Sequence, residues 1–150
     1  MFKKLSAILV CLFAICTVTF LLKANAVPPR ANIKPSDYDT GITLQEALAQ
    51  NKKPIVANFY VDWCGYCKKF APILHGLSID YKDKYIFVLV NVEDPKNKKY
   101  VKDYYISSFP SLYLINPANN NRVFVPQGIY SDKALLKKEF DRFLSVNKVK

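Results

Sequence analysis

The chain has 150 residues, of which 51% are hydrophobic and 14% aromatic, so its length fits one globular domain plus a short leader. Its 22 basic residues outnumber its 12 acidic ones and give a net charge of +10. No nucleic-acid-binding motif accompanies this charge, so we expect no nucleic-acid partner and interpret it as a solvated surface with weak attraction for acidic partners or anionic lipid.

The first 26 residues differ in character from the rest of the chain. Two lysines precede an uncharged apolar run, Leu5 to Leu22, and Ala24-Asn25-Ala26 then places small residues at the positions that a signal peptidase recognises. This pattern predicts a signal peptide over residues 1–26 and export to the periplasm or another extracytoplasmic compartment. The alternative is an uncleaved membrane anchor over residues 5–22, because this run approaches the spanning length and Lys23 is unfavourable for cleavage.

Residues 27–41 follow, and their three prolines predict an extended linker to a domain that occupies residues 42–150. Thr43 and Glu46 have the spacing of a capping box. We therefore predict a short helix that Thr43 caps and that ends near Gln50.

A buried strand and a long helix are predicted next. The run from Pro54 to Val61 is nearly continuous in β-prone residues, as expected for a strand covered on both faces. After Gly65 the apolar residues recur at three- and four-residue steps, which predicts a helix, and Pro72 is expected to kink it. The apolar positions of this helix are Phe70, Ile73, Leu74 and Leu77.

The second half of the domain continues the alternation. Tyr85 to Val92 is predicted as a second buried strand, Pro95 to Tyr105 as a lysine-rich helix and Ser111 to Asn116 as a third strand. A turn then precedes a fourth strand, Arg122 to Pro126, so the last two strands are expected to form a hairpin. Ser131 is predicted to cap a final amphipathic helix.

This order of elements predicts an α/β fold. Strands separated by helices favour parallel pairing, and the last two strands add an antiparallel hairpin. We therefore expect a mixed central sheet of about four strands with helices on both of its faces. The ten tyrosines and ten phenylalanines agree with a sheet-containing fold.

The stretch DWCGYCKKF, residues 62–70, contains Cys64 and Cys67, which are the only cysteines after the leader. They lie where the predicted strand ends and the helix begins, three positions apart, so their sulfurs can meet as a disulfide. Free amide hydrogens and the positive dipole end of the helix favour an anion there, so we expect Cys64 to have a lowered pKa and to be the nucleophile. Lys68 is expected to add positive potential, Gly65 to let another chain approach closely, and Cys67 to act as the resolving thiol.

Two other uses of the pair are weaker. A structural staple is disfavoured, because two cysteines this close in sequence constrain the unfolded chain very little. Structural zinc usually needs four ligands, whereas the chain after the leader offers this pair and one histidine, His75, which we interpret as a helix-surface or half-buried residue. We therefore predict no metal ion and no other cofactor, only a redox-active Cys64–Cys67 disulfide.

Several stretches together resemble the thioredoxin superfamily. NFYVDWCGYCKKFAP is similar to the family's active-site strand, Trp-Cys-x-x-Cys turn and proline-containing helix, with Pro72 in the place of the helix proline. SSFPSLYLI resembles the loop that carries the family's cis-proline, and VPQGIY resembles the glycine loop after the last strand. The resemblance covers about residues 42–146, and it implies a thioredoxin fold in which a cis-Pro110 faces the cysteine pair.

The resemblance also implies a substrate-binding surface around the nucleophile. A substrate peptide would lie against Trp63, Tyr66, Phe109, Pro110 and Gly128. The alternative for Trp63 and Tyr66 is ordinary core packing, and for Phe109 both interpretations stay open.

Two positions depart from thioredoxins proper. Asn58 stands where the family has a buried aspartate that relays protons, and Leu89 stands where it has a neighbouring lysine. Asn58 can form hydrogen bonds but cannot act as a base near neutral pH. It is therefore either an active-site support, with proton transfer through water, or simply a buried polar residue whose hydrogen bonds are satisfied.

The activity implied by the resemblance is that of a dithiol-disulfide oxidoreductase, which exchanges disulfides with protein thiols and has a membrane or exported redox partner. The Gly65-Tyr66 pair, with no histidine between the cysteines, is similar to periplasmic isomerases and to exported domains that receive electrons through a membrane reductase. We therefore favour a reducing or isomerising role. The alternatives are a disulfide-forming oxidase and a non-catalytic binding module or metallochaperone.

Overall fold

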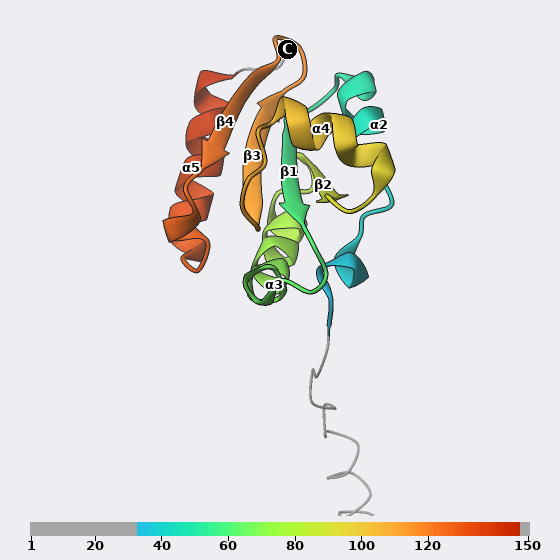
Figure 1. Ribbon diagram of the computed structural model, residues 1–150. Helices are drawn as coiled ribbons and strands as arrows, with labels where there is room; N and C mark the ends of the chain where they lie inside the picture. The colour runs from blue at the N-terminus through green and yellow to red at the C-terminus, as the bar shows by residue number, and fades with distance from the viewer. Residues whose placement is uncertain (1–32, 148–150) are drawn as a thin grey trace, which may run out of the picture. The chain divides into compact units, whose positions relative to one another are not determined.

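The computed structural model describes residues 33–147, so the predicted leader, the first part of the predicted linker and the last three residues lie outside the described residues. Four strands form one mixed sheet in the order β2-β1-β3-β4 (Figure 1). Their bounds are β1 Ile55–Tyr60, β2 Ile86–Asn91, β3 Ser111–Asn116 and β4 Asn121–Val125. Strand β1 is parallel to β2, and β3 and β4 form the predicted antiparallel hairpin.

The pairing of β3 with β1 differs from the prediction, because these two strands are antiparallel although a helix separates β3 from β2. That helix is α4, Lys98–Asp103. It ends near β4, where the Arg122 side chain donates to the carbonyl oxygen of Asp103 at 3.2 Å. Residues 104–110 then lead back, without helix or strand, to the carboxyl end of β1. Strand β3 starts there, with Ser111 opposite Phe59, and therefore runs in the opposite direction.

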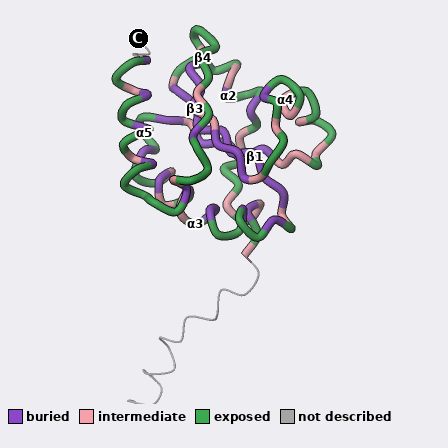
Figure 2. The backbone as a smooth tube through the Cα atoms, turned by 60° about the vertical axis from the view of Figure 1, so that its left-hand side comes forward, coloured by how far each residue is buried: buried purple, intermediate pink, exposed green. Residues whose placement is uncertain are grey.

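Helices cover both faces of the sheet, as predicted (Figure 1). Helices α3, Gly65–Asp80, and α5, Lys133–Val146, pack on one face, and helices α2, Leu44–Gln50, and α4 pack on the other. Side chains of β1 alternate between the two resulting cores, so Val56 packs towards α3 and α5, whereas Ala57 packs towards α2 and α4. Every residue of β1 is buried (Figure 2), which explains its nearly continuous apolar sequence.

Three short 3-10 helices accompany these elements: η1 Pro35–Tyr38, η2 Pro95–Asn97 and η3 Gln127–Ile129. The single helix predicted from Pro95 to Tyr105 is therefore divided into η2 and α4. Within residues 33–147, none of the helices combines the length and the apolar character needed to cross a bilayer.

One predicted helix cap is confirmed and one is wrong. The Thr43 hydroxyl accepts from the amide of Glu46 at 3.2 Å, and the Glu46 carboxylate accepts from the amide of Thr43 at 2.8 Å, which is the predicted capping box. Helix α5 is capped by Asp132 and not by Ser131. The Asp132 carboxylate accepts hydrogen bonds from the amides of Ala134 and Leu135, and its negative charge is favourable at the positive end of the helix dipole.

The predicted linker is also shorter than expected. Residues 33–41 belong to the same compact unit as the rest of the domain, and Pro35 of η1 is buried. Thr40 donates its hydroxyl hydrogen to the carbonyl oxygen of Phe87 in β2 at 2.9 Å. The prolines did not distinguish an extended linker from a segment bound to the domain surface, because proline is compatible both with extended backbone and with the first position of a short helix such as η1.

The buried face of α5 yields a stability prediction. Phe140 is fully buried among Tyr81, Tyr85 and Phe87, with ring centroids 5.4–6.1 Å away. Replacing it by alanine should lower the unfolding free energy by about 3–5 kcal/mol, because the site loses apolar contacts and keeps a cavity. Urea denaturation measures this, with Leu135→Ala on the exposed side of α5 as the control, expected to cost about 0.5 kcal/mol. Equal losses in the two variants would contradict this description of the core.

Candidate active site

The cysteine pair lies at the junction between β1 and α3, as predicted. Cys64 is the N-cap residue of α3, and its sulfur accepts a hydrogen bond from the amide of Cys67 at 3.1 Å. Both thiols are free. Cys64 keeps 8% of its surface accessible and Cys67 keeps 1%, so the Cys64 sulfur is the one that a second molecule can reach.

Burial also separates the chemistry of the two thiols. The pKa of Cys67 is raised to about 12, mainly because burial disfavours its thiolate and also because of its hydrogen bond with Cys64. Cys67 therefore stays protonated near neutral pH. A thiol in this state does not begin an exchange reaction, but it can complete one when it loses its proton.

The cis-proline segment forms the wall opposite the pair. The Phe109–Pro110 peptide bond is cis, as the resemblance implied, and Pro110 is buried. The Cys64 thiol donates to the carbonyl oxygen of Phe109 at 3.7 Å. A small apolar cluster of Tyr60, Val61, Leu89, Val92 and Phe109 surrounds the two cysteines. The peptide segment that carries Pro110 therefore contacts Cys64 through Phe109.

The two aromatic residues of the cysteine motif are not part of the core. Trp63 is 68% exposed and Tyr66 is 75% exposed, so the core-packing alternative is wrong for both. The Trp63 indole donates to a carboxylate oxygen of Glu93 at 2.9 Å, and its ring meets that of Phe109 edge-on at 6.4 Å. Phe109 is half-buried, and it contributes both to the cluster around the cysteines and to the exposed aromatic surface.

A groove of about 480 Å³ opens beside Pro110. It brings together four of the predicted substrate-binding residues, Tyr66, Phe109, Pro110 and Gly128. Gln127 of η3 donates its amide hydrogens to the carbonyl oxygen of Pro110 at 2.7 Å and to the Ser108 hydroxyl at 3.0 Å, which fastens the glycine loop to the cis-proline segment.

Several residues of this surface were not predicted from the sequence. Lys69 and Ile73 of α3 and Ser131, in the turn before α5, also line the groove, and Glu93 accepts the hydrogen bond of the Trp63 indole. The spacing of Lys69 from Tyr66, three positions along one helix, is the one local signal that could have placed it there. Lys68 is exposed to solvent, and its predicted effect on Cys64 stays a prediction.

Asn58 is buried in β1, but its hydrogen bonds are not satisfied. Its Oδ1 atom has no hydrogen-bond partner among residues 33–147, so the interpretation as a satisfied polar residue is wrong. Leu89 lies beside it in β2, in agreement with the predicted correspondence, and Leu112 lies beside it in β3. An unpaired buried acceptor between two leucines costs free energy of folding, roughly 1–3 kcal/mol.

Metal-ligating side chains do not gather in the described part of the chain: within residues 33–147, no three His, Cys, Asp or Glu side chains come together. His75 lies on the exposed surface of α3, where its ring packs against Tyr38 with centroids 5.0 Å apart. This position agrees with its interpretation as a helix-surface residue.

Comparison with known proteins identifies relatives of this domain. A family model described as Thioredoxin matches residues 38–141. Thioredoxin-T of Drosophila melanogaster is 36% identical over 89 residues, which are 59% of this chain and 54% of that protein. The chloroplastic thioredoxin-like protein HCF164 of Arabidopsis thaliana is 32% identical over 54% of this chain and 31% of its own length. Thiol:disulfide interchange protein TxlA of Synechococcus elongatus is 29% identical over 77% of this chain and 58% of its own length.

The chain thus spans between 31% and 58% of the length of these relatives. Among solved structures, the reduced thioredoxin pre-protein of Schistosoma mansoni has a TM-score of 0.55 and 30% identity, and the match covers 67% of this chain and 89% of that one. Thioredoxin NaTrxh of Nicotiana alata has the same TM-score at 24% identity and is similar in fold.

The raised pKa of Cys67 yields a pH prediction. The native state favours the protonated thiol, whereas an unfolded chain titrates near the ordinary cysteine value of about 8.5. The unfolding free energy of the reduced protein is therefore unaffected by Cys67 below that pH, and it decreases as the pH rises towards about 12. Denaturant titrations of reduced wild type and Cys67→Ser measure this effect, and the wild-type stability should fall more steeply. Tyrosines and lysines titrate in both proteins, so only the difference counts, and equal slopes would contradict the raised pKa.

Proposed function

Since this chain belongs to the thioredoxin family, we propose that it is an exported thiol-disulfide oxidoreductase that acts on protein substrates through Cys64 and Cys67. The observation that carries the proposal is the geometry of Cys64. Its sulfur caps a helix, accepts an amide hydrogen bond and lies against the carbonyl oxygen of Phe109. The names of its relatives, which include thioredoxins and a thiol:disulfide interchange protein, support the same activity.

In the reducing direction, the first step is attack by the Cys64 thiolate on one sulfur of a substrate disulfide. A bond forms between Cys64 and that sulfur, the substrate disulfide breaks, and the other substrate sulfur leaves as a thiolate. The hydrogen bond from the Cys67 amide stabilises the Cys64 thiolate before attack. The adjacent groove holds the substrate backbone and side chains near Tyr66 and Pro110.

In the second step Cys67 attacks Cys64. Cys67 gives up its proton, its sulfur bonds to Cys64, the mixed disulfide between Cys64 and the substrate breaks, and the substrate sulfur that was bound to Cys64 leaves as a thiolate that takes up a proton. Two electrons have then passed from the protein to the substrate, and the Cys64–Cys67 disulfide remains. Asn58 cannot accept the proton of Cys67, so we assign that role to water or to the departing substrate thiolate.

Export is supported by the leader pattern of residues 1–26. The HCF164 relatives of Arabidopsis and rice are chloroplastic, so relatives of this domain function in compartments other than the cytosol. We favour a reducing or isomerising direction because Gly65 and Tyr66, without a histidine, separate the cysteines. The redox state of the pair in living cells tests this direction: a mostly reduced pair supports it, and a mostly oxidised pair indicates an oxidase.

Replacing the resolving thiol tests the activity. Cys67→Ser should accumulate disulfide-linked adducts between Cys64 and substrate proteins, because the second step is blocked. Non-reducing gels of extracts from cells that express the variant measure these adducts. Adding a reductant to the extract should remove them. The matched control is Cys64→Ser, which should form none. A Cys67→Ser protein that keeps its partners without any covalent adduct would indicate a binding module.

The groove yields a second functional prediction. Tyr66→Ala should lower kcat/KM for reduction of a disulfide-bonded peptide by about threefold to tenfold, since an aromatic contact is worth about 0.5–1.5 kcal/mol. Its melting temperature should change little because the side chain is exposed. Tyr105→Ala is the control, since Tyr105 is 89% exposed and lies outside the groove. If the two variants have the same kcat/KM, the groove does not bind the substrate.

A further inference from the structure

Residues 34–40, called the strap below, cross the outside of the domain ahead of α2. The strap contains η1, which packs against both α3 and β2. Tyr38 lies against the ring of His75 on α3, and Thr40 donates to the carbonyl oxygen of Phe87 in β2. The strap is therefore bound to α3, the helix that follows the loop of residues 61–64, and to β2, the strand beside β1.

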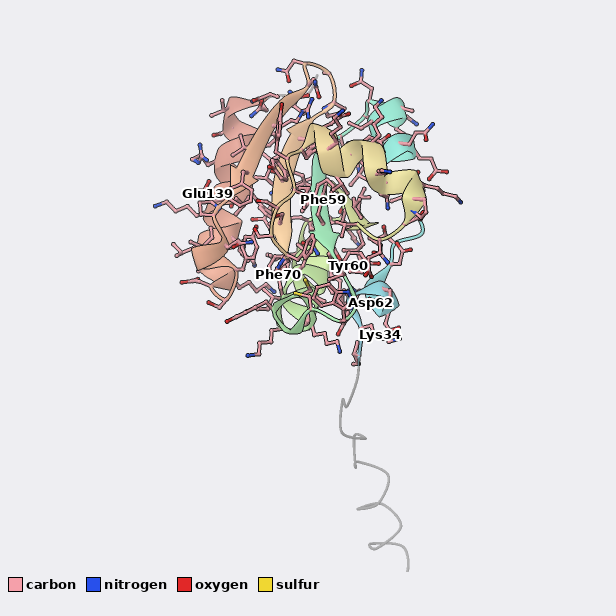
Figure 3. The ribbon with its side chains drawn as sticks, viewed as in Figure 1. Lys34, Phe59, Tyr60, Asp62, Phe70 and Glu139 are labelled. Atoms are coloured by element: carbon pink, nitrogen blue, oxygen red, sulfur yellow. The ribbon has the colours of Figure 1, made fainter. Side chains whose placement is uncertain are left out.

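Ser36 of the strap makes a direct, two-point contact with that loop. Its amide donates to Oδ1 of Asp62 at 3.1 Å, and its hydroxyl donates to Oδ2 of the same carboxylate at 2.9 Å. Asp62 is half-buried and stands two positions before Cys64. Figure 3 labels Lys34, where the strap begins, and Asp62, and both lie below the end of β1 in that view.

Trp63, the residue after Asp62, is held by a different segment, the one that follows β2. The Trp63 indole donates to Glu93, and the amide of Glu93 in turn donates to the side chain of Asn91 at the end of β2. Residues 61–64 contain no helix or strand of their own. Side-chain bonds from two distant segments thus fix the backbone that leads into Cys64.

We propose that Ser36 and Asp62 are positioning residues for Cys64 and that they act through their own contact; this inference rests on the proposed role of Cys64 as the attacking thiol. Both oxygens of the Asp62 carboxylate are occupied by donors from Ser36. Without the two hydrogen bonds from Ser36, the Asp62 carboxylate would be free to turn towards the sulfur of Cys64, where its negative charge would disfavour the thiolate. The two bonds also restrict the loop, which keeps the Cys64 sulfur near the Cys67 amide.

The test compares four single variants of the purified reduced protein. Ser36→Ala removes the hydroxyl donor, Ser36→Thr keeps it, and Asp62→Ala removes both acceptors. The matched control, Thr40→Val, removes a bond of the same strap that does not reach the loop. Trp63 is the single tryptophan of the chain, so its fluorescence anisotropy reports on the loop alone. The rate of Cys64 alkylation by iodoacetamide reports on the thiolate, and neither readout needs a disulfide substrate.

Ser36→Ala should lower the Trp63 anisotropy and slow Cys64 alkylation by about threefold to tenfold, a change of the size expected for the loss of one ordinary hydrogen bond. Ser36→Thr should restore both values, and Thr40→Val should leave both at the wild-type level. The double variant Ser36→Ala/Asp62→Ala should have the same anisotropy as Asp62→Ala alone, because the two residues act through one contact.

Two results would overturn the proposal. In the first, Ser36→Ala lowers only the melting temperature and leaves the anisotropy and the alkylation rate unchanged. In the second, Thr40→Val changes both readouts as much as Ser36→Ala does. A wild-type protein without disulfide exchange activity would instead refute the proposed function, and the anisotropy measurement would still decide whether the strap orders the loop.

Discussion

The chemistry of this domain depends on one hydrogen bond, from the amide of Cys67 to the sulfur of Cys64. That bond exists because a buried strand runs almost directly into a helix, so that Cys64 occupies the N-cap position and faces an amide without a partner in the helix. The same geometry carries Cys67 into the interior, where its thiol is held protonated. A single structural junction therefore gives two identical side chains different reactivities.

The rest of the fold keeps this junction in place. Strand β1 is buried on both faces and is paired on both edges, so its end is fixed by packing and by backbone hydrogen bonds. After the end of β1, residues 61–64 have no strand pairing, and hydrogen bonds from side chains restrict them instead. Asp62 is bound by the strap and Trp63 by Glu93. Within residues 33–147 the Oδ1 atom of Asn58 has no hydrogen-bond partner, and an unpaired buried polar atom lowers stability.

Local sequence signals predicted most of the architecture. The apolar run of β1, the capping box at Thr43 and the periodicity of α3 each depend on neighbouring residues only, and each is present in the structure. The thioredoxin resemblance added the cis bond at Pro110, which no local pattern requires. The direction of β3 was missed, because it depends on the path of an irregular segment between α4 and the sheet.

Contacts between distant residues account for the remaining failures. Ser36 and Asp62 are 26 positions apart, and nothing around Ser36 distinguishes a bound strap from a linker. The same limit applies to Asn58, since its lack of a partner depends on the residues that three strands bring around it. For Trp63 and Tyr66, their position beside the cysteines favoured a contact surface over core packing, and both side chains are exposed.

The fastening of Gln127 to Pro110 has a consequence for how the protein matures. The two cysteines are neighbours in the sequence and can meet in a chain that has not yet folded, whereas the groove needs Pro110 and Gly128 to come together from separate segments. Pairing of the thiols can therefore precede folding, but selection of a substrate cannot. A newly made chain could therefore form the disulfide before it folds, and completion of the fold would add the groove beside Pro110.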